Sequence, residues 1–188
     1  MPMDERHPAL ARREESILLV VDVQERLWPV IDAREAVGAN LHRLLEGARI
    51  LEVPVVLSEQ YPKGLGPTIA AVRDKAPGAT VVAKTAFSCG GEPAIVEGLR
   101  RHDRDTLVVA GIEAHVCVLQ TALDFLARGY RVHVVADAVS SRAAANRAIA
   151  LDRMARAGVQ VSCTESVLFE WMAEAGSDAF RRVQALLK

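Results

Sequence analysis

A cysteine, Cys117, stands where a strand-like pattern gives way to a helix-like one. The residues before it, 106–112, are apolar and rich in β-branched types, which is typical of a strand covered on both faces. Leu119, Leu123 and Leu126 recur after it at helical spacing. A thiol beside the unpaired N–H groups of a helix start is shifted toward the thiolate, which is its nucleophilic form. The pattern therefore indicates a reactive cysteine, against the alternative of a small, inert, buried one.

Two charged residues end other apolar segments. Asp22 lies at the end of the segment 16–23, and Lys84 ends the segment 79–84. A charged side chain in a buried strand is costly unless it has a partner, so we expect the two to meet in one cleft. There Asp22 would accept and return the proton of Cys117, while Lys84 would keep Asp22 ionised and stabilise a thiolate. Each residue taken alone also fits a structural role, as a loop cap or a salt-bridge partner.

Alternating strand-like and helix-like segments must position these residues. The expected strands are 16–23, 53–58, 79–84, 106–112, 130–136 and 159–162. The expected helices are 33–51 capped by Asp32, 93–101, 113–128, one from Ser140 or Ser141 to Gly158, one capped by Thr164, and one opened by Ser177. This alternation predicts a parallel sheet with helices on both faces, and a site beyond the carboxyl ends of its strands.

The bulk composition narrows the classes of function. The 188 residues are 51% hydrophobic and 25% charged, and we expect one domain over 1–188. A net charge of −1 gives no electrostatic basis for binding nucleic acid or an anionic membrane. The first residues are polar, and no apolar run is long enough to span a bilayer. Three widely spaced cysteines with no CxxC pair favour a reducing, cytoplasmic location.

Three motifs follow one another along the chain: Val-Val-Asp22-Val-Gln, Lys84-Thr-Ala-Phe and Gly111-Ile-Glu-Ala-His-Val-Cys117. In this order they resemble the isochorismatase-like cysteine hydrolase superfamily, and loops at 59–66 and 135–142 resemble its isochorismatase domain-containing branch. The resemblance runs from about residue 16 to the last residue. It implies a three-layer α/β/α sandwich with a six-stranded parallel sheet of the Rossmann-like isochorismatase type. It also implies a homo-oligomer, a catalytic triad of Asp22, Lys84 and Cys117, and a cis peptide bond between Ile112 and Glu113.

Two further sets of groups complete the expected site. The helix start offers the backbone N–H groups of Cys117 and Glu113 to a developing oxyanion. Residues that follow the first three strands or precede the cysteine are expected to contact substrate, with packing within or between subunits as the alternative for His115 and the aromatic residues. These substrate-binding candidates are Gln24, Trp28, Gln60, Tyr61, Phe87 and His115.

No metal and no cofactor are expected. Nicotinamidases of the superfamily hold a metal with an Asp-x-His pair and a second histidine after the second strand, whereas this chain reads Ser58-Glu-Gln-Tyr61 there. The favoured function is cysteine-dependent hydrolysis of a small amide, or a related carbonyl–nitrogen compound, through an acyl thioester. The alternatives are isochorismatase-type vinyl-ether hydrolysis by Asp22 without the thiol, and a non-catalytic binding protein on the same fold.

Overall fold

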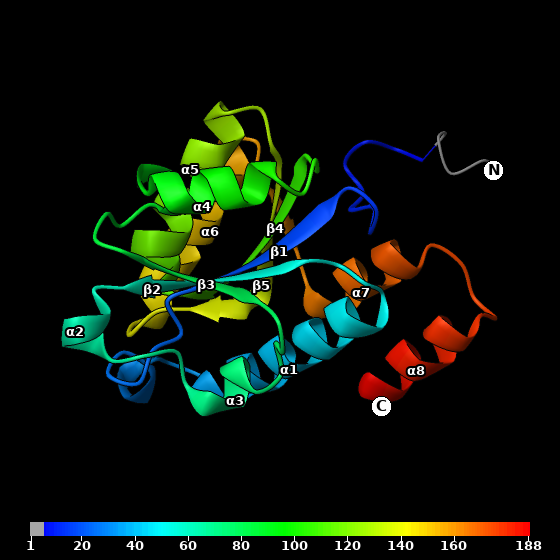
Figure 1. Cartoon of the computed structure of the whole chain (residues 1–188), viewed down its shortest axis with the longest axis horizontal. Helices are drawn as coiled ribbons and strands as arrows, with labels where there is room; N and C mark the ends of the chain where they lie inside the picture. Colours follow the sequence, from blue (N-terminus) through cyan, green and yellow to red (C-terminus); the bar gives the residue numbers. More distant parts are fainter. Residues whose placement is uncertain (1–5) are drawn as a thin grey trace.

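The computed structural model describes residues 6–188, which form a six-stranded parallel sheet between two layers of helices (Figure 1). The strands are β1 (Ser16–Val21), β2 (Val55–Gln60), β3 (Thr80–Lys84), β4 (Thr106–Ile112), β5 (Arg131–Ser140) and β6 (Gln160–Ser162). Their order across the sheet is β3-β2-β1-β4-β5-β6, so the order reverses between β1 and β4. The predicted α/β/α sandwich is confirmed.

Helices connect the strands on both faces of the sheet. The α-helices are α1 (Arg34–Ile50), α2 (Pro62–Leu65), α3 (Ala70–Arg73), α4 (Pro93–Arg100), α5 (Leu119–Ala127), α6 (Ala144–Arg156), α7 (Thr164–Met172) and α8 (Asp178–Leu186). Three shorter turns are the 3₁₀ turns η2 (Trp28–Val30) and η3 (Cys89–Gly91) and the π-helical turn η4 (Ala114–Val118). None of the helices within residues 6–188 has the length and apolar content needed to cross a membrane.

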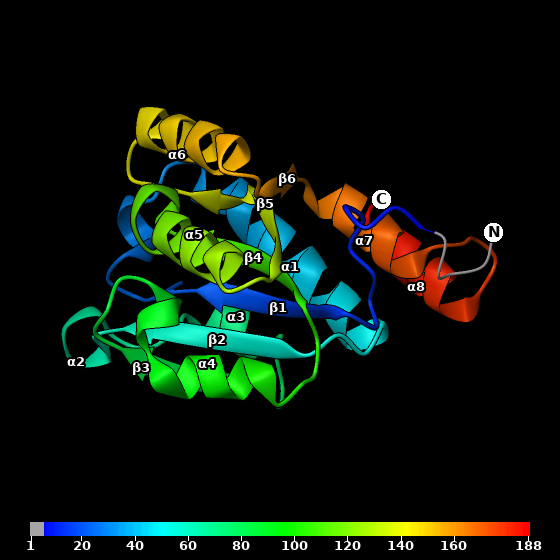
Figure 2. The same ribbon diagram turned by 90° about the horizontal axis from the view of Figure 1, so that it is seen from above.

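The two cores follow from the alternation of side chains along β1. Leu18 and Val20 face α1, α3, α7 and α8. Ile17, Leu19 and Val21 face α4, α5 and α6. Successive residues of a strand point to opposite faces, so a strand buried on both sides must be apolar throughout, as β1 is. The two helix layers stand above and below the sheet in Figure 1, and Figure 2 looks down through the layer of α4, α5 and α6 onto the strands, with α1 behind them.

Three predicted helix caps are wrong, and one of them is Thr164, which is the first residue of α7 and follows Cys163 at the cap position. α1 begins after Ala33, whose φ is 51° and whose side chain makes no cap, so the predicted Asp32 cap is wrong. The Asp32 backbone is instead held by the end of β5: its N–H donates to the Ser141 carbonyl, and its carbonyl accepts from the Ser140 hydroxyl. β5 continues through Ser140, and α6 therefore begins at Ala144 without a side-chain cap.

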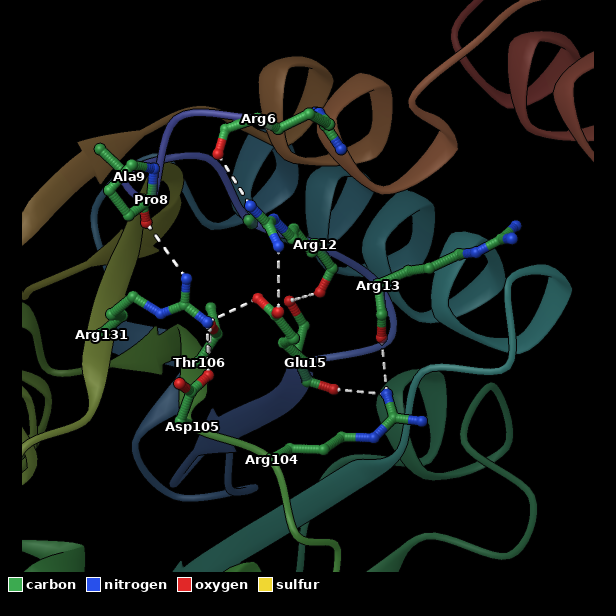
Figure 3. Close-up of polar contacts among 12 residues, drawn as sticks. Arg6, Pro8, Ala9, Arg12, Arg13, Glu15, Arg104, Asp105, Thr106 and Arg131 are labelled. Carbon is green, nitrogen blue, oxygen red and sulfur yellow. Dashed lines mark hydrogen bonds and ion pairs between the residues drawn. The ribbon is translucent and has the colours of Figure 1, made fainter. Parts of the chain in front are cut away.

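A polar network anchors the first described residues to the amino-terminal end of the sheet (Figure 3). Arg131, which begins β5, donates to Glu15 and Asp105, both at 2.5 Å. Arg104 donates to the carbonyls of Arg13 and Ser16 at 2.6 and 2.9 Å. These contacts hold the segment before β1 at the end of the sheet opposite to the carboxyl ends of the strands.

Candidate active site

Asp22, Lys84 and Cys117 all come from the carboxyl-terminal ends of strands. Asp22 follows β1, Lys84 is the last residue of β3, and Cys117 lies in the turn η4 that follows β4. β1 and β4 are neighbours where the strand order reverses, which is where ligand sites form in parallel sheets of this kind. Lys84 starts two strands away from Asp22, and its long side chain crosses the end of β2 to reach the carboxylate.

Asp22 and Lys84 form a fully buried ion pair. The Lys84 Nζ lies 2.7 Å from the Asp22 Oδ2, and both side chains are 0% exposed. Burial of two charges is costly unless further hydrogen bonds satisfy them. The ammonium therefore also donates to the Gln60 Oε1 at 2.7 Å and to the Phe87 and Ala86 carbonyls at 3.0 and 3.2 Å.

Asp22 leaves the regular geometry of β1. Its φ is 52°, in the left-handed region that non-glycine residues rarely adopt. Its N–H donates to the Ser58 carbonyl at 3.1 Å, and its Oδ1 accepts from the Ser58 hydroxyl at 2.7 Å. The two carboxylate oxygens thus have different partners, a hydroxyl on one and an ammonium on the other. Ser58 was not among the residues proposed from sequence, although a serine among the apolar residues of β2 is an unusual residue to bury.

The pKa of Cys117 is raised, whereas its position in the sequence predicted a lowered one. Burial raises the pKa of Cys117, the Asp22 charge raises it further, and only the Lys84 charge opposes them. The Lys84 ammonium is already bound to the carboxylate, and the thiol is 5% exposed. The residue also lies within a π-helical turn that runs into α5, so it is less close to a free helix terminus than the sequence indicates.

The turn before Cys117 is tied to the loop after β5. The peptide bond between Ile112 and Glu113 is cis. The Glu113 carboxylate accepts from the Arg142 backbone N–H at 2.9 Å and from its guanidinium at 2.7 Å. Burial alone would raise the pKa of Glu113, but the bonds from Arg142 outweigh it and the pKa is lowered. This ionised pair fixes the start of η4, whose Glu113 carbonyl accepts from the N–H groups of Val116 and Val118.

His115 packs against the same loop. Its Nδ1 lies 2.9 Å from the Ser141 hydroxyl, and its Nε2 lies 3.5 Å from the Asn146 amide nitrogen. Both ring nitrogens therefore face groups of this chain, which favours the packing alternative for His115 over a direct substrate contact. Its contacts reinforce the Glu113–Arg142 pair that holds η4.

Gln24 and Gln60 hold the loops around the site. The Gln24 amide donates to the carbonyls of Gln60 and Gly66 and accepts from the Gln60 N–H, and its side chain is fully buried. The Gln60 amide donates to the Thr85 carbonyl and accepts from Lys84. Both amides are engaged at both ends, so a substrate contact from either would require one of these bonds to break.

The three aromatic candidates differ in exposure. Tyr61 and Phe87 are each 55% exposed, whereas Trp28 is half-buried and packs on α1 beside Gly38. Phe87 also provides one of the carbonyls that hold Lys84. A surface hollow of about 310 Å³ adjoins Lys84 and is lined in part by Tyr61, Thr85 and Glu92. Within the described residues, no three His, Cys, Asp or Glu side chains are grouped so as to hold a metal ion.

Comparison with known proteins identifies relatives of the chain. The profile of the Isochorismatase domain matches residues 16–166. Isochorismatase domain-containing protein 1 of Salmo salar is 43% identical over 178 residues. That alignment covers 92% of this chain and 61% of the salmon protein, so the chain spans about three fifths of the length of this relative.

Solved structures share the fold over almost the whole chain. MAR1 ribonuclease from Caenorhabditis elegans is 36% identical with a TM-score of 0.89, and the match covers 95% of this chain and 92% of that one. The ycaC gene product of Escherichia coli, described as an octameric hydrolase of unknown specificity, is 24% identical with a TM-score of 0.86, covering 97% and 89%. The second likeness shows the fold alone.

Proposed function

The chain belongs to the isochorismatase family, and from this premise we propose that it is a cysteine-dependent hydrolase of a small amide or related carbonyl–nitrogen compound. The observation that supports this most directly is the buried Asp22–Lys84 pair, with its 2.7 Å contact, at the strand ends that also carry Cys117. A buried acid and ammonium beside a thiol are the groups that nucleophilic acyl transfer needs. Asp22, Lys84 and Cys117 are the proposed catalytic residues.

In the proposed mechanism the thiol loses its proton only during attack. Because the pKa of Cys117 is raised, its attack needs a base. Asp22 is the proposed base: it takes the thiol proton as the sulfur bonds to the substrate carbonyl carbon. Asp22 then gives this proton to the leaving nitrogen as the carbon–nitrogen bond breaks. Water attacks the thioester while Asp22 takes its proton, and the departing sulfur regains a proton from Asp22. Acid and amine are released, and the enzyme returns to its starting state.

Lys84 and the backbone of the turn stabilise charge in this scheme. Lys84 keeps its ammonium 2.7 Å from Asp22, which favours the ionised carboxylate at the start of each step. The N–H groups of Glu113 and Cys117 are the proposed donors to the oxyanion. Because Cys117 is 5% exposed, only a small or slender substrate is expected to bring its carbonyl to the sulfur.

A panel of small aliphatic and aromatic amides tests this proposal. We expect the wild-type protein to release ammonia or amine, the Cys117→Ala variant to be inactive, and the Cys163→Ala variant to keep full activity. Cys163 is the matched control because its thiol lies beside Ser166, away from the three proposed catalytic residues. Mass spectrometry of quenched reactions is expected to find an acyl adduct on Cys117. Turnover by Cys117→Ala at the wild-type rate would remove the thiol from the mechanism.

The burial and raised pKa of Cys117 favour a second candidate, vinyl-ether hydrolysis by Asp22 with the thiol idle. In that reaction a protonated Asp22 would give its proton to the vinyl carbon, and water would add to the resulting cation. Cleavage of a vinyl ether at equal rates by the wild-type and Cys117→Ala proteins, with no amide hydrolysed, would support this candidate over the first.

Assembly into a homo-oligomer is also proposed. The octameric description of the Escherichia coli neighbour supports it, as do exposed apolar side chains such as Val30 and Ile149, each 59% exposed. Light scattering in solution is expected to give a mass of at least twice the 20.4 kDa of one chain. A monomeric mass at micromolar concentration would contradict the proposal.

A further inference from the structure

We propose that Ser58, on β2, is a positioning residue for Asp22. Its hydroxyl holds the Asp22 carboxylate in the orientation needed to exchange a proton with Cys117. This inference rests on the proposed function for its catalytic consequence, but its effect on Asp22 is measurable without a substrate. Ser58 lies in the strand between the strands that carry Asp22 and Lys84, where it contacts the acid directly.

Ser58 contacts Asp22 at two points. The Ser58 carbonyl accepts from the Asp22 N–H at 3.1 Å, and the Ser58 hydroxyl donates to the Asp22 Oδ1 at 2.7 Å. The β1–β2 register pairs Val21 with Ser58, so the parallel ladder itself delivers the serine beside the residue that follows β1. One residue thereby fixes both the backbone and the side chain of Asp22.

The geometry of Asp22 requires such a constraint. With φ at 52°, Asp22 has left the strand conformation, so the alternation of β1 no longer sets the direction of its side chain. Lys84 holds Oδ2, but one contact leaves the carboxylate free to rotate about its bond to Cβ. The second contact, from Ser58 to Oδ1, fixes the carboxylate plane.

The Ser58 hydroxyl lies near two acceptors, the Asp22 carboxylate and the Cys89 thiol. Ser58 is 1% exposed, so bulk water does not compete for its proton. The titratable groups around it are Asp22 after β1, Lys84 on β3, Cys89 on η3 and Cys117 on η4. Burial raises the pKa of Cys89, which favours its neutral thiol. The Lys84 ammonium only donates hydrogen bonds, so it cannot accept one from Ser58. Asp22 is therefore the charged acceptor for the hydroxyl.

A hydrogen bond to an ionised carboxylate favours that form over the protonated one. Loss of the hydroxyl should remove this preference and let the carboxylate turn. A bond to a charged group is strong enough that its loss in the transition state is expected to lower kcat by about tenfold. KM should change little, because Ser58 is buried and does not reach substrate.

Ser58→Ala is the main variant, and Ser16→Ala is its matched control. Ser16 is a buried serine at the start of β1, and its hydroxyl also makes one hydrogen bond, to the Arg12 carbonyl at 2.6 Å, far from Asp22. The pair Ser58→Thr and Ser58→Val covers effects on folding, because the two side chains have nearly the same shape and differ in the hydroxyl. The contact at Asp22 is read from its carboxyl ¹³C chemical shift at pH 7 in aspartate-labelled protein, assigned with Asp22→Asn.

We expect Ser58→Ala and Ser58→Val to move the carboxyl resonance of Asp22 and to lower kcat, and Ser58→Thr and Ser16→Ala to stay near wild type in both. A carboxyl resonance of Asp22 in Ser58→Val that coincides with that in Ser58→Thr would overturn the inference, whatever the activity. If no amide is hydrolysed by the wild-type protein, the proposed function fails while the NMR comparison still decides the role of Ser58.

Discussion

The charge on Asp22 opposes ionisation of Cys117, and this opposition can be measured. Burial is the main cause of the raised pKa of the thiol, and the Asp22 charge is the next. Removing that charge in Asp22→Asn, with the Lys84 ammonium left in place, should lower the pKa of Cys117. The rate of iodoacetamide labelling of Cys117 against pH measures this, with labelling of Cys163 as the internal control.

The same variant separates reactivity from catalysis. Asp22→Asn is expected to label faster than wild type at pH 8 and yet to hydrolyse no amide, because it has lost its base. An unchanged labelling profile would show that Asp22 does not act on the thiol. A melting curve recorded beside each assay is needed, since the substitution leaves a buried ammonium without its counter-ion, at a cost of about 3–5 kcal/mol.

His133 makes the stability of the fold sensitive to mild acid. It is a buried residue of β5, and burial, followed by the charge of Arg131, lowers its pKa to about 4. Its pKa in the folded state lies below the unfolded value near 6.5. Between these two values the unfolded chain binds a proton at His133 and the folded chain does not. Stability from this group is complete above about pH 6.5 and falls as the pH drops toward 4, by roughly 3 kcal/mol in all.

Urea unfolding at pH 7, 6 and 5 tests this expectation. The wild-type protein should lose stability with acid more steeply than His133→Leu, by up to about 1.4 kcal/mol per pH unit. His7→Gln serves as the control because His7 is exposed. Parallel pH dependences in the wild-type and His133→Leu proteins would contradict the assignment to His133.

At the scale of the elements, apolar runs predicted the sheet well, while local polar residues predicted helix starts poorly. β1 and β4 are buried along their whole length, so their sequences had to be continuously apolar and were recognised. Asp32 has the right residue type for a cap, but a long-range contact to Ser141 decides its conformation. A local pattern contains no information about such a partner.

The same distinction applies to the candidate site. Strand ends place Asp22, Lys84 and Cys117 at one edge of the sheet, which strand-like patterns alone predict. The pKa of Cys117 is raised by burial and by a carboxylate distant in sequence, whereas the sequence pattern predicted a lowered pKa. Ser58 was missed because its significance lies in its register opposite Val21, which only the paired strands reveal.

Gly111 on β4 has no room for a side chain. Its φ is 112°, and an added Cβ would lie 2.2 Å from the Val21 carbonyl oxygen and 2.6 Å from the Val21 nitrogen. Both atoms are backbone of β1, directly before Asp22, so they cannot move without disturbing the acid. Gly111→Ala is expected to lower the free energy of unfolding by at least about 3 kcal/mol and to abolish any activity.

At Gly98 the glycine-to-alanine substitution is expected to have the opposite effect on stability. It lies within α4, and an added Cβ would meet no atom within 4 Å. Gly98→Ala should therefore stabilise the protein by about 0.5–1 kcal/mol through the lower helix propensity of glycine. Urea unfolding of both variants measures the contrast. Equal effects of the two substitutions would show that the close approach of β4 to β1 does not limit residue 111.

At the scale of the whole molecule, the anchoring network and the proposed active site lie at opposite ends of the sheet. Arg131 begins β5 and binds Glu15 and Asp105 (Figure 3), whereas Asp22 and Cys117 follow the far ends of β1 and β4. Stability and reactivity should therefore be separable by substitution. Arg131→Met keeps much of the packing of the side chain but removes both ion pairs, and these partly exposed pairs contribute about 1–2 kcal/mol together.

Arg131→Met should also change how the fold responds to acid. The Arg131 charge lowers the pKa of His133, so its removal raises that pKa toward the unfolded value and shrinks the loss of stability below pH 6.5. The variant is thus expected to be less stable than wild type at pH 7, with a gap that narrows toward pH 5, while iodoacetamide labels Cys117 at the wild-type rate. A changed labelling rate would mean that the two ends of the sheet are coupled. A gap that stays constant with pH would mean that Arg131 does not act on His133, because the two ion pairs alone predict no narrowing over a range in which their carboxylates stay ionised.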